Sequence, residues 1–174
     1  MVRAYGLALL LAIQAPSDTM LRGAALVKQL TGALAGQKLD SIAAQDPSEK
    51  DRFIAARFYP DSQLLVVSAR SASPAQVKSG LEQRRYREVY ADLHIAAIPQ
   101  TTVFFQDMKA DGLCATRDQV ADIVYEQSGS RTVFDADWRK HDISEEEYRR
   151  RLTAADEAYS KLLEVLLAQL REHE

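Results

Sequence analysis

A long amphipathic segment at the C-terminus constrains the fold of this chain more than any other feature. Ser144 and Glu147 form a capping box, a typical signal for the start of a helix. Apolar residues then recur at spacings of three and four: Tyr148, Leu152, Ala155, Tyr159, Leu162, Leu166 and Leu170. Three acid–arginine pairs stand four residues apart in the order that stabilises a helix: Glu145–Arg149, Glu146–Arg150 and Glu147–Arg151. A helix of about 30 residues and roughly 45 Å is therefore predicted.

The apolar stripe of this helix is wider than the seam of a coiled coil. Leu163, Val165 and Leu167 extend it near the C-terminal end. A two-stranded coiled coil uses a narrow seam, whereas a helix that packs on its own sheet uses a wide face. We therefore predict that this helix belongs to the core of its own domain, with Leu162 buried.

A β-hairpin is the clearest feature of the middle of the chain. Strand-like segments at 52–59 and 63–70 flank the turn signal Pro60-Asp61. If Pro60 and Asp61 form the loop, one face is uncharged and should be core: Ile54, Ala56, Phe58, Leu65, Val67 and Ala69. The other face is mixed: Phe53, Arg57, Leu64, Val66, Ser68 and Arg70. We expect the mixed face to be partly covered or to face a binding site.

The remaining elements complete an α+β fold. Helices are predicted at 19–36, at 74–85 and from Thr116 to Gly129, the last containing Ile123 and Val124. Strands are predicted near 88–95, 101–106 and 132–134, whereas 39–44 is ambiguous. The expected architecture is an antiparallel sheet around the central hairpin 52–70, with packed helices on one face and the long C-terminal helix across it.

The first fifteen residues have the layout of a secretory signal peptide. Arg3 gives a positive start, an uncharged apolar run follows to Ile13, and Ala15 precedes a polar segment. The apolar run is shorter than the roughly 20 residues that span a bilayer. Residues 1–15 are therefore expected to be a signal peptide and 16–174 a single domain, periplasmic or secreted. An ordinary buried N-terminal helix is the alternative.

Composition sets broad limits on the partners. A net charge of −3 gives no reason to expect nucleic acid, and no membrane span is expected after signal cleavage. The single cysteine, Cys114, excludes a disulfide within the chain and is expected to be a small core residue. The partner is left as an unknown small molecule or protein.

Five residues are candidates for ligand binding. Arg57 and Arg70 on the mixed hairpin face could hold an anionic group. Tyr90, Asp92 and His94 would share one face of a strand, where the carboxylate could orient the histidine as a base. An ordinary polar sheet face gives the same pattern and is the preferred interpretation of these three.

Two acidic segments have weak metal-site character. Asp107, Asp111, Gly112 and Asp118 match calcium-loop positions, but Lys109 stands where a ligand should be, so a turn is preferred. Asp135, Asp137 and His141 could form an oxygen–nitrogen set. The preferred interpretation there is a linker anchored by Trp138, and no metal is expected.

Three segments resemble uncharacterised exported bacterial proteins: 64–70, 86–93 and 134–140. The resemblance would cover most of the chain after the signal, and it implies export without an assigned activity. The order of helix, hairpin, helix and strands also loosely resembles flavin-binding split barrels, although no phosphate-binding residue carries over.

These observations favour an exported, non-catalytic domain that binds a ligand or a partner. The alternative is a flavin- or haem-binding split-barrel-like protein or enzyme that uses the mixed hairpin face. The sequence specifies neither a cofactor nor a catalytic residue.

Overall fold

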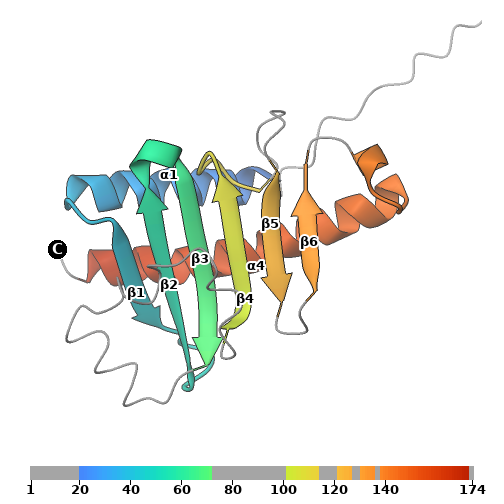
Figure 1. Cartoon of the computed structure of the whole chain (residues 1–174). Coiled ribbons are helices and arrows are strands. Elements are labelled where there is room, and N and C mark those ends of the chain that lie inside the picture. The colour runs from blue at the N-terminus through green and yellow to red at the C-terminus, as the bar shows by residue number, and fades with distance from the viewer. Residues whose placement is uncertain (1–19, 72–100, 114–120, 127–129, 136–137, 173–174) are drawn as a thin grey trace, which may run out of the picture.

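The computed structural model describes residues 20–71, 101–113, 121–126, 130–135 and 138–172, and it confirms the α+β fold. Its centre is a six-stranded antiparallel sheet in the order β1-β2-β3-β4-β5-β6 (Figure 1). The strands are β1 (Ser41–Gln45), β2 (Arg52–Tyr59), β3 (Leu64–Ser71), β4 (Thr101–Met108), β5 (Asp122–Glu126) and β6 (Arg131–Phe134). The helices α1 (Met20–Gly36) and α4 (Glu145–Arg171) lie on one face of this sheet.

The predicted hairpin is β2 and β3, and its faces are confirmed. Ile54 pairs with Ala69, Ala56 with Val67 and Phe58 with Leu65, which places the uncharged residues together. The loop is longer than the two residues expected, because a 3₁₀ turn, η1 (Pro60–Ser62), is followed by Gln63 with a left-handed φ of 50°. A shift of two residues in pairing leaves every side chain on the same face, so the face assignment survives.

The core lies between the uncharged hairpin face and the two helices. Val27, Leu30 and Leu34 of α1 are fully buried. On α4, two of the three residues that widen the stripe are buried, Leu163 at 0% and Leu167 at 6% exposed, and Val165 is partly buried. The long helix therefore packs within its own domain, and Leu162 belongs to the same core.

The start of α4 follows the predicted capping with one difference in its ion pairs. The Ser144 hydroxyl accepts a hydrogen bond from the backbone N–H of Glu147 at 3.1 Å. Glu145 pairs with Arg149 and Glu147 with Arg151, as expected. Arg150 pairs with Glu147 at 2.8 Å instead of Glu146, so one carboxylate serves two guanidinium groups.

One predicted helix is wrong. Ile123 and Val124 were expected on a helix after Thr116, but both belong to strand β5. Ile123 pairs with Gln106 of β4 and with Val133 of β6, so the segment has strand partners on both sides. Ladder pairing on two sides outweighs a weak local helical spacing.

Several further predicted elements can be compared with the structure. The ambiguous segment 39–44 contains most of β1, and the strands expected at 101–106 and 132–134 are β4 and β6. Trp138, in the 3₁₀ turn η3 (Trp138–Lys140), packs against the core as predicted. The helix expected at 74–85, the strand expected at 88–95 and residues 1–19 lie outside the described residues.

Candidate functional site

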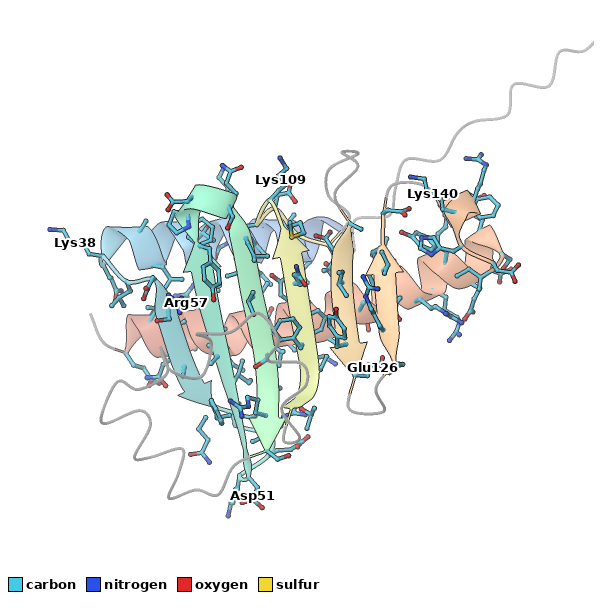
Figure 2. The ribbon with its side chains drawn as sticks, in the orientation of Figure 1. Lys38, Asp51, Arg57, Lys109, Glu126 and Lys140 are labelled. Atoms are coloured by element: carbon cyan, nitrogen blue, oxygen red, sulfur yellow. The ribbon has the colours of Figure 1, made fainter. Side chains whose placement is uncertain are left out.

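Arg57 and Arg70 lie on the same face of the hairpin, as predicted, but the structure keeps them apart. Arg57 is opposite Val66, and Arg70 is opposite Phe53. At roughly 3.3 Å per residue, the two arginines are separated by about 13 Å along the strands. Figure 2 shows Arg57 on β2, away from the end of the strand that carries Phe53. One small anion cannot bridge both guanidinium groups across this distance.

Each of these arginines lies over an aromatic ring. The guanidinium carbon of Arg57 is 4.7 Å from the centroid of Tyr59, and that of Arg70 is 5.8 Å from the centroid of Phe53. Arg57 also lies 3.9 Å from Asp40. These cation–π contacts hold both side chains close to the sheet. The sheet face that carries these two arginines is the one opposite the helices. It is buried at Ala43, Ala55, Leu64, Val66, Ser68 and Phe104.

The other three predicted site residues, Tyr90, Asp92 and His94, lie outside the described residues, as do Cys114, Asp118 and Asp137. His141 Nε2 lies 3.4 Å from Asp135 Oδ1. Within the described ranges, no group of three or more His, Cys, Asp or Glu side chains could hold a metal ion.

A buried group of acids lies where β4, β5, α1 and α4 meet, and the sequence analysis missed it. Asp107, Asp122 and Asp156 are 0%, 3% and 1% exposed. The Asp107 carboxylate accepts hydrogen bonds from the backbone N–H of Asp111 at 3.2 Å, from that of Gly112 at 3.0 Å and from the Tyr159 hydroxyl at 3.0 Å. Asp107 therefore ties the turn after β4 to helix α4.

Burial raises the pKa values of Asp107, Asp156 and Tyr159. Burial, reinforced by the neighbouring Asp122, raises the pKa of Asp107 to about 8. Burial also raises the pKa of Asp156 to about 6, although the backbone N–H of Gly23 and the charge of Arg22 act against it. Burial and the neighbouring Asp107 raise the pKa of the Tyr159 hydroxyl above its ordinary value. Asp107 therefore links β4 to α4, and Asp122 links β5 to β4.

Two grooves lined by described residues follow α4, and each has one wall on the helix. The edge groove, of about 640 Å³, lies between the C-terminal half of α4 and the strands β1 and β2. Many of its lining residues carry charged or amide side chains: Gln45, Asp46, Arg52, Lys161, Glu164, Gln169 and Glu172. One of its ion pairs is internal, since Asp46 accepts hydrogen bonds from Arg52 Nε at 2.7 Å and from the Ser48 hydroxyl. Hydrogen bonds from Ser48, and then the contact with Arg52, hold the pKa of Asp46 below its usual range against the effect of burial.

The second groove has the character of a site for an apolar ligand. We call it the alanine groove, with a volume of about 400 Å³ between α4 and the strands β4, β5 and β6. Its floor and helical wall are Val103, Phe105, Val124, Phe134, Ala154, Ala155 and Ala158. Its polar rim is Glu126, Ser130, Thr132, Arg150 and Arg151. An apolar floor with a few polar groups at the rim is typical of small-molecule sites.

The small side chains of α4 explain why this groove exists. The inward stripe of α4 consists mainly of leucines and tyrosines, and its smaller members, Ala155, Asp156 and Ser160, lie in the middle of the helix. The helix packs more extensively against β1, β2 and β3 than against β4, β5 and β6. Where the helix lies farther from the sheet, Ala154, Ala155 and Ala158 do not fill the space. A small residue inside a stripe of large ones was the only sequence signal for this site.

Comparisons with known proteins add no relative: no family model, curated protein or solved structure matches this chain. None of the described helices is long and apolar enough to cross a membrane. The interpretation of the site therefore depends on its geometry.

Proposed function

We propose that this protein is an exported, non-catalytic binding domain that holds an apolar small molecule in the alanine groove. The observation that carries the proposal is the floor of Phe105, Val124 and Phe134 beneath a helical wall of alanines. A volume of about 400 Å³ falls within the range of about 300–1,000 Å³ typical of ligand sites. The edge groove is larger, and seven charged or amide side chains line it against three in the alanine groove.

A fluorescent probe tests the location of binding. N-phenyl-1-naphthylamine is neutral and apolar, and its emission rises when it leaves water. We expect a saturable rise with the purified protein and loss of that rise in Ala158→Phe, which fills the alanine groove. Ala168→Phe is the matched control, because Ala168 is an exposed alanine on the same helix that lines the edge groove.

The outcomes separate the alternatives. Retained binding in Ala168→Phe together with loss in Ala158→Phe supports the proposal. Loss in Ala168→Phe alone would move the site to the edge groove and contradict it. A protein that gives no saturable signal would contradict the binding function itself. Near-ultraviolet circular dichroism of both variants shows whether each retains the native fold.

Export is proposed on the order of charge, apolar run and small residue in the first fifteen residues. We expect protein recovered from its own cell envelope to begin at or near Pro16. N-terminal sequencing measures this directly. A soluble cytoplasmic protein that still begins Met1-Val2-Arg3 would contradict export and would leave the groove proposal standing.

A further inference from the structure

The charges around the alanine groove are unevenly distributed. Arg150 and Arg151 lie at the N-terminal end of its helical wall and share the single carboxylate of Glu147, at 2.8 Å and 2.7 Å. These contacts lower the pKa of Glu147 to about 2, so it is ionised at neutral pH. Arg150 and Arg151 line this end of the groove whereas Glu147 does not, so the charged groups on its helical wall are positive.

The negative charge of the rim comes from the strands. Glu126 lies at the end of β5 (Figure 2), and its Oε2 accepts a hydrogen bond from the Ser130 hydroxyl at 2.9 Å. No ion pair joins Glu126 to Arg150 or Arg151 among the described contacts. The groove therefore has an apolar floor, a positive group on its helical wall and a negative group on its strand rim.

Resting on the function proposed above, we propose that the ligand is an amphipathic anion with an unbranched or flat apolar body and one carboxylate-like head. The body lies on Phe105, Val124 and Phe134, and the head lies at Arg150 and Arg151. Arginine suits this role because its planar donors match the oxygens of a carboxylate. The exposed position of both arginines keeps the head in contact with water, so no unpaired charge is buried.

Paired ligands that differ only in the head test this proposal. Dodecanoate and dodecanol are titrated as competitors of N-phenyl-1-naphthylamine, below the concentration at which dodecanoate forms micelles. We expect dodecanoate to bind more tightly than dodecanol. The double change Arg150→Gln with Arg151→Gln should lower the affinity for dodecanoate on the order of tenfold, which is the scale of one charge-assisted hydrogen bond. Binding of dodecanol should be unchanged.

Two further variants serve as charge controls. Arg149→Gln removes an exposed arginine that pairs with Glu145 outside the groove, and it should leave both ligands unaffected. Glu126→Gln removes the negative charge of the rim and should strengthen dodecanoate binding only. Raising the salt concentration should weaken dodecanoate and leave dodecanol unchanged, because salt screens exposed charges.

The two proposals fail in different ways. Equal binding of dodecanoate and dodecanol, both lost in Ala158→Phe, would overturn the anionic head and retain the apolar groove. A dodecanoate affinity that falls as much in Arg149→Gln as in the double variant would also overturn the head-group assignment. Displacement of the probe by neither compound would overturn the ligand class. No probe binding at all would overturn the proposed function.

Discussion

At the scale of single residues, the buried carboxylates are the most unusual chemistry in this protein. Asp107 organises the turn after β4 through two backbone N–H groups and joins it to Tyr159 of α4. In that turn Gly112 has a φ of 98°, and a Cβ there would lie 2.6 Å from the Cα of Ala24. Asp156 of α4 lies against Gly23 in the first turn of α1. Buried carboxylates therefore lie at the contacts of β4 with α4 and of α4 with α1.

The glycines of α1 provide a matched pair of substitutions. A Cβ at Gly23 would clash with the buried Asp156 carboxylate, whereas a Cβ at Gly32 would meet nothing within 4 Å. Gly32→Ala should stabilise the protein by about 0.5–1 kcal/mol, because alanine loses less backbone entropy in a helix. Gly23→Ala should instead destabilise it by about 1–3 kcal/mol through overpacking. Urea unfolding of both variants measures this, and a stabilised Gly23→Ala protein would contradict the close contact of α1 and α4.

The raised pKa values predict how stability depends on pH. Unfolded aspartate has a pKa of about 4, whereas Asp107 and Asp156 have values of about 8 and about 6 in the folded protein. Between pH 4 and pH 8 the folded state therefore binds more protons than the unfolded state. The free energy of unfolding should rise as pH falls through this window, by at most about 1.4 kcal/mol per pH unit for each site.

Below about pH 4 the trend should reverse. Asp46 and Glu147 have lowered pKa values, so the stability that they contribute is lost as they become protonated. Urea unfolding from pH 4.5 to pH 8.5 tests the upper window. Asp107→Asn should flatten the slope, and Asp61→Asn, at an exposed position in η1, is the control. A wild-type protein that becomes more stable from pH 5 to pH 8 would refute this assignment.

At the scale of elements, sequence periodicity predicts helices and strands whose apolar residues repeat regularly. It does not predict elements that form because of contacts with residues distant in the sequence. The three–four spacing of α4 and the alternation of β2 and β3 were sufficient to predict these elements and their core faces. The strand β5 was mistaken for part of a helix because Ile123 and Val124 fit a weak local helical spacing. Its first residue, Asp122, is a buried acid. That carboxylate accepts the backbone N–H of Met108 at 2.7 Å, a partner 14 positions away that no local pattern shows.

The packing of α4 is tested by truncating one side chain. Leu162 is 6% exposed and belongs to the core between the helices and the sheet. Leu162→Ala should cost about 2–5 kcal/mol, as a core truncation does. Its melting temperature should not change with protein concentration, because the helix packs within its own chain. A strong concentration dependence across a hundredfold dilution series would show that this stripe is an interface between chains.

At the scale of the whole molecule, one long helix divides its face of the sheet into unequal parts. Large side chains seal α4 onto β1, β2 and β3, with α1 packed against α4, and small ones leave the alanine groove over β4, β5 and β6. The candidate residues Arg57 and Arg70, predicted from the sequence, lie on the sheet face opposite the alanine groove. A groove depends on the distance between a helix and a sheet, and that distance is set by tertiary packing rather than by local pattern. The proposed function therefore stands on the groove and not on the two arginines.

Methyl NMR spectroscopy with dodecanoate reports where in the protein a ligand lies. We expect chemical-shift changes concentrated at the methyl groups of the alanine groove: Val103, Val124, Ala154, Ala155 and Ala158. The methyl groups of the edge groove should stay unchanged: Ala44, Ile54, Val165 and Ala168. Shifts confined to the edge groove, or no shifts in either groove, would contradict the assignment of this protein as a binding domain with its ligand beneath the alanines of α4.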